Sequence, residues 1–374
     1  MKTVLREANM TLDELVDAIK AGGPALQEMI TLQLAEAGQF SKIGFKMDAE
    51  MNYLLMGDDD PSQTRAYNPE LGDEMVRKFD GITAMLQEVI NFQRDHVNPV
   101  LKFMNEQIKR GGGQVDVRKG TTQAGISNSS YFSRVWNIID QLILSIKVKE
   151  AVPLVVEDLR KGVKPVIALK STMEAMFKKM VDNKELKKGD TIPLDFSYVL
   201  RQGMDTVMKY TEKDEGGNAM PRLLEPEDLM PAGRDKYYQL LERIQKLTTG
   251  IPISPIDVLK RGVKDAGYET VEITGRGTMF EMNEDMSEGT FVNNDKPDKI
   301  TAVDKFNDNP GVVAIINRSG STGISMHSGP KMGDKNQRSM YILQTDLDIN
   351  VVVQTLGRVY RAKQLNKPID NIIT

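Results

Sequence analysis

The sequence predicts an α/β protein built on an open, parallel β-sheet. Five short runs rich in branched apolar residues are typical of strands buried on both faces, and helical patterns lie between them. The runs are Pro165-Val-Ile-Ala-Leu169, Thr270-Val-Glu-Ile-Thr274, Val312-Val-Ala-Ile-Ile316, Ser339-Met-Tyr-Ile-Leu-Gln344 and Ile369-Asp-Asn-Ile-Ile373. At 374 residues the chain is long enough for two domains, each with its own core.

The first of these domains, residues 1–160, is predicted to be a mostly helical accessory region. Apolar spacing predicts two short helices over 11–37 and a long amphipathic helix over 71–90 that kinks or ends at Pro99. A second long helix is predicted from Tyr131 onward, with Trp136, Ile139 and Leu142 among its apolar residues.

The sheet domain is predicted over residues 161–374. Its first two strands are separated by an oversized interval at about 181–267. Helical patterns occur in that interval at 197–210, 235–247 and 255–266. We therefore expect a mostly helical insertion there.

Composition excludes several kinds of chemistry. The chain has no cysteine and only two histidines, so disulfides, thiol nucleophiles, zinc clusters and most histidine-based triads are not expected, and no metal site is predicted. The formal charge of −4, from 49 basic and 53 acidic residues, argues against an all-basic coat but allows a local nucleic-acid groove. No stretch is apolar enough to span a membrane, and we expect a cytoplasmic location.

Loops at the carboxyl ends of the strands are the expected binding region, because open α/β sheets bind ligands there. After the first strand, Lys170, Ser171 and Thr172 offer a charge and two hydroxyls that suit a phosphate backbone. A second interpretation is that Ser171 or Thr172 only caps the helix that follows. After the third strand, the run Ser319-Gly-Ser-Thr-Gly323 offers hydroxyls and exposed amides that can cradle phosphates.

The most informative segment is Gln354-Thr-Leu-Gly-Arg-Val-Tyr-Arg361. If it is helical, then Gln354, Arg358 and Arg361 share one face, because they are four and three residues apart. Two arginines on one face could grip a triphosphate and stabilise charge during phosphoryl transfer. The other interpretation is a surface helix that forms salt bridges.

The order of these segments resembles the second RecA-like lobe of superfamily-2 helicases, whose motifs IV, V and VI follow strands in the same order. The similarity narrows to the Strawberry notch helicase family and covers most of the chain. It is carried by Asp17-Ala-Ile-Lys-Ala-Gly-Gly-Pro-Ala25, Ala35-Glu-Ala-Gly-Gln-Phe40, Ser319-Gly-Ser-Thr-Gly-Ile-Ser-Met-His327, Asn336-Gln-Arg338 and the Gln354 to Arg361 segment. The resemblance implies a RecA-like open parallel sheet with helices on both faces.

The resemblance also implies roles for single residues. Arg361 would be the arginine finger, with Arg358 as a second γ-phosphate contact and Gln354 beside them. Gly323 and Gly357 would lie near the nucleotide. Nucleic-acid backbone contacts would come from four hydroxyl residues, Ser171, Thr172, Ser321 and Thr322.

The sequence departs from the family in lacking a phosphate-binding loop of the form Gly-x-x-x-x-Gly-Lys-Ser/Thr and a strand that ends in Asp-Glu. ATP and Mg²⁺ would then be held mainly by an N-terminal RecA-like lobe, in the same or another chain. We expect this chain to be a fragment or a split-gene product that does not hydrolyse ATP alone. The expected partner is DNA or RNA, and no membrane interaction is expected.

The alternative hypothesis is a degenerate lobe that acts as a scaffold or binds a partner protein without catalysis. The two retained arginines argue against it. The resemblance is compatible with several sources. We expect a phage or bacterial one, and for a phage-encoded protein a location in the host cytoplasm or the virion.

Overall fold

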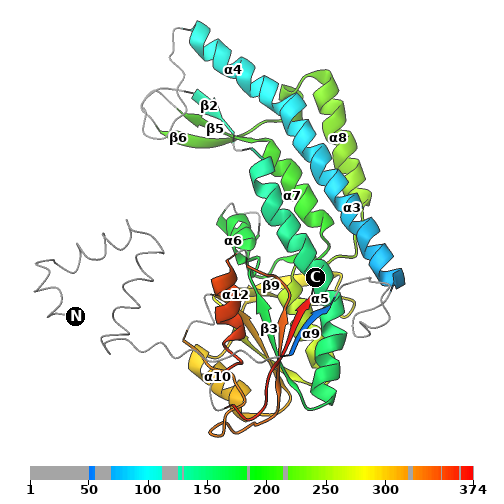
Figure 1. Cartoon of the computed structure of the whole chain (residues 1–374). Coiled ribbons are helices and arrows are strands. Elements are labelled where there is room, and N and C mark those ends of the chain that lie inside the picture. Colours follow the sequence, from blue (N-terminus) through cyan, green and yellow to red (C-terminus); the bar gives the residue numbers. More distant parts are fainter. Residues whose placement is uncertain are drawn as a thin grey trace, which may run out of the picture. The chain divides into compact units, whose positions relative to one another are not determined.

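The computed structural model describes residues 50–54, 69–111, 125–128, 130–182, 186–213, 218–318, 323–346, 348–361 and 364–373. All of them belong to the unit formed by residues 49–374 (Figure 1). No helix among them is long and apolar enough to cross a bilayer. The two helices predicted over 11–37 lie outside the described residues.

A six-stranded sheet in which all neighbouring strands run parallel forms the centre, in the order β1-β12-β11-β3-β10-β7. Its strands are β1 (Glu50–Leu54), β3 (Lys164–Leu169), β7 (Glu269–Ile273), β10 (Val312–Asn317), β11 (Arg338–Ile342) and β12 (Ile369–Ile373). The five predicted strands are confirmed, and so is the α/β class. β1 is an addition that the sequence did not predict, because it is a half-exposed edge strand without a continuous apolar run.

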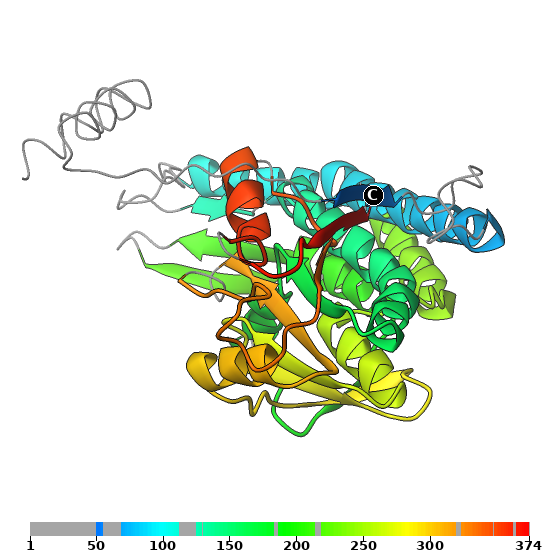
Figure 2. The same ribbon diagram turned by 60° about the horizontal axis from the view of Figure 1, so that its bottom comes forward.

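Helices cover both faces of this sheet (Figure 2). On one face lie α5 (Phe132–Arg160) and α9 (Pro255–Asp265), which pack side chains such as Val148 and Leu259 against Ile167 and Ile315. On the other face lie α10 (Lys299–Asp308) and α12 (Ile349–Leu356), which enclose a separate apolar core. The helices on both faces that the sequence predicted are therefore present.

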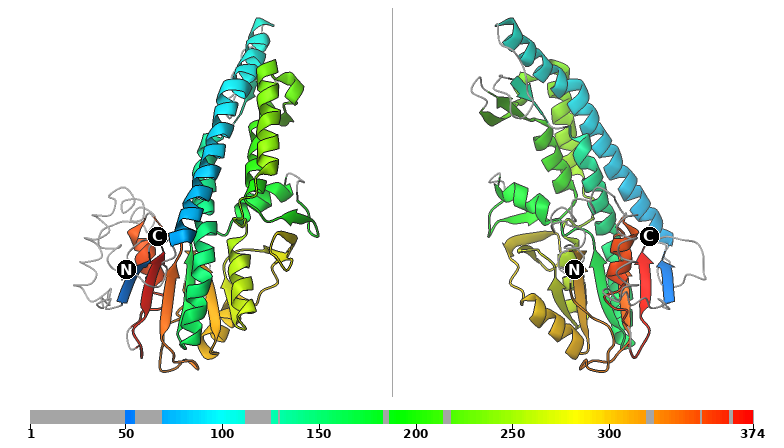
Figure 3. Two further views of the ribbon diagram at one scale, coloured as in Figure 1. Left: turned by 90° about the vertical axis from the view of Figure 1, so that its right-hand side faces the viewer. Right: turned by 60° about the vertical axis from the view of Figure 1, so that its left-hand side comes forward.

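A helical arm extends beyond the carboxyl ends of the strands and has its own core (Figure 3). It contains the first half of α5, whose second half packs on the sheet. Its other elements are α3 (Pro69–Phe92), the π-helical turn η1 (Gln93–Val97), α4 (Asn98–Arg110), α7 (Ser197–Val207), the 3₁₀ turn η2 (Pro226–Asp228) and α8 (Pro231–Lys246).

The long helix predicted over 71–90 is confirmed as α3, but it does not end at Pro99. The π-helical turn carries the chain into α4, and Pro99 lies in the first turn of that helix. Proline has no backbone N–H to donate, and the wider turn before it accommodates the missing hydrogen bond. The side-chain oxygen of Gln93 in this turn accepts a hydrogen bond of 2.8 Å from the amide of Tyr131, which fixes the start of α5.

Two small antiparallel sheets complete the structure. One is formed by β2 (Gly125–Ser127), β5 (Lys209–Lys213) and β6 (Ala219–Leu223), and the other by β4 (Thr191–Pro193), β9 (Glu288–Asn293) and β8 (Thr278–Met282). The helix α6 (Glu174–Asp182) packs Phe177 against Phe280 and Phe291 of the second sheet. The interval 181–267 thus contains the three expected helices and also three short strands, which helical periodicity alone could not predict.

Candidate functional site

The loop after β3 is fastened to its surroundings by one glutamine. The side-chain oxygen of Gln344, just beyond β11, accepts hydrogen bonds from the amides of Lys170 and Ser171 at 3.2 and 3.1 Å. Its side-chain nitrogen donates to the backbone carbonyl of Asp140 in α5 at 3.1 Å. Gln344 therefore holds the loop in place between two strands and the arm helix. The sequence placed Gln344 in a strand and gave no signal of this role.

The predicted hydroxyl residues Ser171 and Thr172 lie at the carboxyl end of β3 and are half-buried. The Ser171 hydroxyl accepts a hydrogen bond of 3.3 Å from the amide of Met173, which precedes α6, so it stabilises the local turn rather than capping the helix. Met173 has a positive φ of 59°, a conformation that side chains rarely adopt. The Ser171 hydroxyl keeps its own hydrogen to donate to an anion.

A small pocket opens beside this loop, between the carboxyl ends of β3, β10 and β11 and the side of α12. Lys170, Arg318, Gln344 and Asp346 line it, together with Thr355 from α12. Its volume of about 30 Å³ has room for one or two water molecules. It is therefore too small for a nucleotide.

The predicted shared face of Gln354, Arg358 and Arg361 is wrong in one respect, because α12 ends at Leu356. Gln354 lies on the exposed side of α12, whereas Arg358 lies in the turn that follows Gly357 and Arg361 lies beyond that turn. After Leu356 the amides of Arg358 and Val359 donate to carbonyls three residues back, and the Arg358 carbonyl accepts a hydrogen bond of 2.8 Å from the amide of Met326. That tertiary pairing replaces the next helical turn.

The two arginines nevertheless lie close together. The Arg358 guanidinium donates to the carbonyl of Ile324 at 3.4 Å, while its Nε is buried and has no hydrogen-bond partner among the described residues. Arg361 donates through its side chain to the carbonyl oxygens of Gly357 and Tyr360. Its backbone amide donates to the side-chain oxygen of Gln364 at 3.0 Å. Both guanidiniums are therefore held mainly by backbone carbonyls.

Electrostatics mark this arginine pair as a place for an anion. Burial, and then the charge of Arg361, lowers the pKa of Arg358 from its ordinary value. In the part of the chain that the structure describes, neither arginine forms an ion pair with a carboxylate. Two adjacent positive charges without an acidic partner favour binding of a negatively charged group.

His327 lies next to the pair. Burial lowers its pKa, and the charges of Arg361 and Arg338 lower it further, which favours the neutral ring at pH 7. Its Nδ1 is 2.9 Å from the hydroxyl oxygen of Ser325. This contact holds one ring nitrogen of His327 locally.

The remaining predicted residues divide between described and undescribed segments. Gly323 is exposed and has a φ of +76°, which a glycine adopts without strain. Gly357 follows the last residue of α12 and accepts a hydrogen bond from the Arg361 side chain. Ser321 and Thr322 lie outside the described residues.

The structure thus separates the predicted residues into two groups. Ser171 and Thr172 are at the carboxyl edge of the sheet, where α12 begins, whereas Arg358 and Arg361 follow the other end of α12. An eight-residue helix is about 12 Å long. The two groups can therefore contact different ligands.

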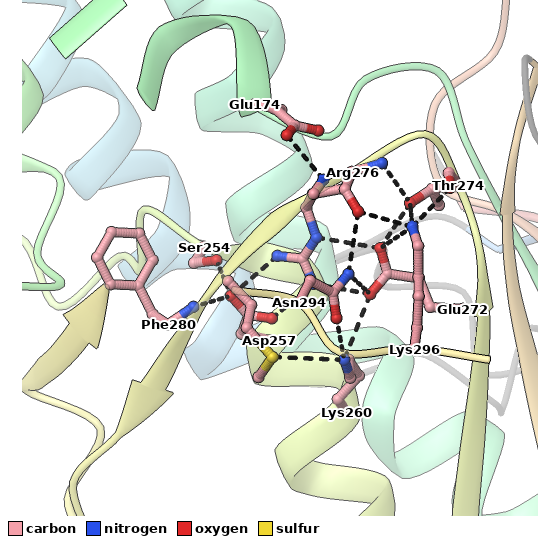
Figure 4. Close-up of polar contacts among 12 residues, drawn as sticks. Glu174, Ser254, Asp257, Lys260, Glu272, Thr274, Arg276, Phe280, Asn294 and Lys296 are labelled. Carbon is pink, nitrogen blue, oxygen red and sulfur yellow. Dashed lines mark hydrogen bonds and ion pairs between the residues drawn. The ribbon is translucent and has the colours of Figure 1, made fainter. Parts of the chain in front are cut away.

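A buried ion network lies beside the edge strand β7 (Figure 4). Arg276, just after β7, forms two hydrogen bonds of 2.9 and 2.7 Å to Asp257 of α9 and another of 2.8 Å to Glu272. Burial would raise the pKa of Glu272, but the hydrogen bond and charge of Arg276 hold it at about 2. Asp257 also accepts from the amide of Phe280 at 2.9 Å, which fastens β8 to α9.

This network is structural, because every charge in it has a partner. Lys260 lies 3.3 Å from Glu272, and Lys296 donates to the backbone carbonyls of Thr274 and Arg276. Sequence reasoning missed it because its members are spread over forty positions with no fixed spacing. Among the described residues, no group of three or more acidic or histidine side chains could hold a metal ion.

A family model and several known proteins match parts of the chain. Residues 258–374 match the family model of the C-terminal domain on Strawberry notch homologue. The human protein Strawberry notch homolog 1 is 26% identical over 152 residues, 39% of this chain and 11% of that protein. The Drosophila melanogaster protein Strawberry notch is 27% identical over 150 residues, 38% of this chain and 9% of that protein.

The alignments therefore cover about a tenth of each relative. The family match begins within α9 and extends through β12, so it includes Gly323, Arg358 and Arg361 but not the loop after β3. The resemblance to the Strawberry notch helicase family, first visible in the motifs, is confirmed over part of the chain, where residues 258–374 match the model of its C-terminal domain.

Proposed function

We propose that this chain is the C-terminal lobe of an ATP-dependent nucleic-acid helicase or translocase. Arg358 and Arg361 would contact the phosphates of ATP bound on a separate N-terminal lobe. The hydroxyl residues Ser171, Thr172, Ser321 and Thr322 would contact the backbone of DNA or RNA. The observation that supports this proposal best is the arginine pair, with no carboxylate partner among the described residues and with the buried Nε of Arg358 unbonded there.

The donor set fits the phosphate end of a nucleotide. Guanidinium groups bind phosphate oxygens through several parallel hydrogen bonds, and Arg358 and Arg361 both retain N–H donors. Such cations stabilise the negative charge that develops as the γ-phosphoryl group leaves, an effect on the order of 10³ to 10⁵ in rate. Gln354, exposed on α12, would lie at the edge of the same surface.

The donor set does not fit the magnesium ion that accompanies ATP. The described residues contain no cluster of acidic side chains that could bind it, and the pocket at the carboxyl edge is too small for a nucleotide. The sequence also lacks a phosphate-binding loop. The nucleotide and its metal would therefore be held by the other lobe, and this chain alone would not hydrolyse ATP.

Arginine replacement tests the proposal. The full chain is combined with a lobe of the same helicase family that carries a phosphate-binding loop, and ATP hydrolysis is measured with nucleic acid present. Arg361→Ala should reduce turnover about a thousand-fold, and Arg358→Ala should reduce it as well, while nucleic-acid affinity is unchanged. Arg160→Ala, an exposed arginine at the end of α5, is the matched control.

Two outcomes would overturn the proposal. Absence of hydrolysis in every such combination would remove the catalytic function. Full activity of both arginine variants would favour the alternative, a lobe that serves only as a scaffold or partner-binding module. A cytoplasmic location and a phage or bacterial source stay predictions, and the relatives compared above are animal proteins.

A further inference from the structure

Two large aromatic side chains are exposed at the start of α5. Phe132 is 69% exposed and Trp136 is 68% exposed. Residues four apart on a helix share a face, so the two rings lie one turn from each other. Neither gains the stabilisation that burial of a large apolar side chain provides. The proposed function does not use them.

The same face of α5 contacts the carboxyl edge of the sheet. Asp140, four residues after Trp136, accepts the hydrogen bond from Gln344 through its backbone carbonyl, and its carboxylate is 3.3 Å from Lys170. Further along this face, Lys147 donates to the carbonyl of Ile373 at the end of β12 at 2.6 Å. Each turn of an α-helix rises about 5.4 Å, so the aromatic pair begins one turn beyond the sheet edge.

The adjoining face of α5 is closed. Val135, Leu142 and Ile146 are buried in the core of the arm. The two rings are exposed beside that face, and Asp140, on their own side of the helix, contacts Lys170 and Gln344 in the loops after β3 and β11. Trp136 therefore lies one helical turn from the contact with the loop that carries Ser171 and Thr172.

Cationic and hydroxyl groups line the carboxyl edge of the sheet that Asp140 contacts. The Lys170 side chain is partly exposed and is paired with Asp140. The Arg318 guanidinium is 70% exposed and lies 3.9 Å from Asp346. A phosphate would compete with these carboxylates for the two cations. Aromatic rings beside cations and hydroxyls are the combination that single-stranded nucleic acid requires, because bases stack on the rings and phosphates contact the charges.

We propose that Phe132 and Trp136 form a stacking platform for unpaired bases of a nucleic-acid strand whose backbone is held by the loop of residues 170–172. The proposal rests on the proposed function and names the form of its substrate. It predicts a preference for single-stranded over double-stranded nucleic acid, because bases in a duplex present no free face.

The only tryptophan of the chain is Trp136, which makes the platform directly observable. The full chain is titrated with a single-stranded oligonucleotide while tryptophan fluorescence is recorded. Stacking should quench the emission, and the affinity should fall as salt is added. An abasic strand of equal length, which keeps the phosphates but lacks the bases, should bind more weakly and leave the emission unchanged.

Variants provide a second measurement, by anisotropy of a labelled oligonucleotide. Phe132→Ala and Trp136→Ala should each weaken single-strand binding at least five-fold, whereas Trp136→Phe should retain most of it. Ile300→Ala removes a side chain that is equally exposed but lies on α10, and it should leave binding unchanged. Circular dichroism and the thermal midpoint of each variant confirm that it is folded.

The outcomes separate the platform from the proposed function. Salt-dependent binding without quenching, and with no effect of either alanine variant, would overturn the platform while leaving the proposed function intact. Unchanged nucleic-acid affinity together with lost association of a partner lobe would assign the aromatic face to a protein contact and also overturn it. No binding of any nucleic acid would overturn both.

Discussion

The backbone amide of Met326 donates a hydrogen bond of 2.8 Å to the carbonyl oxygen of Arg358. This contact joins the segment after β10 to the segment after α12. The Arg358 side chain repeats the connection by donating to the carbonyl of Ile324. The position of Arg358 is therefore set by a loop more than thirty residues earlier, and a change in that loop should affect the arginine.

Gly323 allows a first test of this dependence. Its φ of +76° is strained for any residue with a β-carbon, although no atom lies within 4 Å of where that carbon would be. Gly323→Ala should thus lower the free energy of unfolding by about 1–2 kcal/mol through backbone strain alone. ATP hydrolysis by the reconstituted protein should fall with it, because the loop that positions Arg358 shifts. Urea denaturation and turnover measure the two effects.

Gly81 is the matched control. It lies inside α3 and also has open space around its would-be β-carbon, but its φ is negative. Gly81→Ala should stabilise the protein by about 0.5–1 kcal/mol, because alanine is the better helix former. If both alanine variants changed stability in the same direction, backbone conformation would not be the cause.

The buried network at Arg276 makes a second prediction. Arg276→Ala leaves the carboxylates of Asp257 and Glu272 buried without their main cation, and it should destabilise the protein by about 3–5 kcal/mol. Arg261 lies on α9, the helix that carries Asp257. Arg261→Ala breaks only a partly exposed pair with Asp265 and should cost less than about 1 kcal/mol. Equal losses in urea denaturation would contradict the structural role of the network.

The pH dependence of stability should contain two opposing contributions. The folded-state pKa of Glu272 is about 2, below its unfolded value, so its contribution is fully present above pH 4.5 and is lost as the pH falls toward 2. Burial raises the pKa of Asp370 in β12 to about 7, and its carboxylate has no hydrogen-bond partner among the described residues. The folded state therefore keeps that proton longer than the unfolded chain does.

Asp370 should consequently reduce stability as the pH rises from about 4 to about 7, with a slope of up to about 1.4 kcal/mol per pH unit. The asparagine of Asp370→Asn cannot ionise, so this variant should lack the slope. Its free energy of unfolding should therefore rise relative to that of the wild type as the pH increases. Urea denaturation at pH 5 and pH 8 measures the difference. Parallel changes in both proteins would show that the carboxyl is not the group responsible.

Close contact between α5 and α9 gives a fourth prediction. A β-carbon added at Gly262 would lie 2.5 Å from a methyl carbon of Val152. Gly262→Ala should destabilise the protein by about 1–3 kcal/mol, because the two helices must move apart. Val152→Ala makes room, and the double variant should recover part of the loss. A double-mutant cycle with no coupling between the two positions would contradict this packing.

The parallel strands could be predicted from the sequence because they are buried on both faces and read as continuous apolar runs. The edge strand β1 could not, since Met51 and Tyr53 are exposed and leave no such run. Helical periodicity likewise could not separate the buried Leu142 from the exposed Trp136, because it shows which residues share a face but not what covers that face.

At the candidate site, the sequence predicted the arginine pair but not its geometry. The prediction that Gln354, Arg358 and Arg361 share one face assumed an unbroken helix from residue 354 to residue 361. Gly357 was the available warning, since glycine is typical of the residue that follows a helix end. The hydrogen bond from the Met326 amide to the Arg358 carbonyl replaces the next helical turn. Such a pairing between distant segments cannot be predicted from local residue spacing.

The α5 helix has one mechanical consequence. Its 29 residues make a rod of about 43 Å, clamped at one end in the core of the sheet and at the other in the core of the arm. Such a rod acts as a lever. A tilt of about 5° at the sheet end would displace the far end by about 4 Å over this length. A small rotation of the sheet would therefore produce a larger displacement of the arm and of any molecule bound to it.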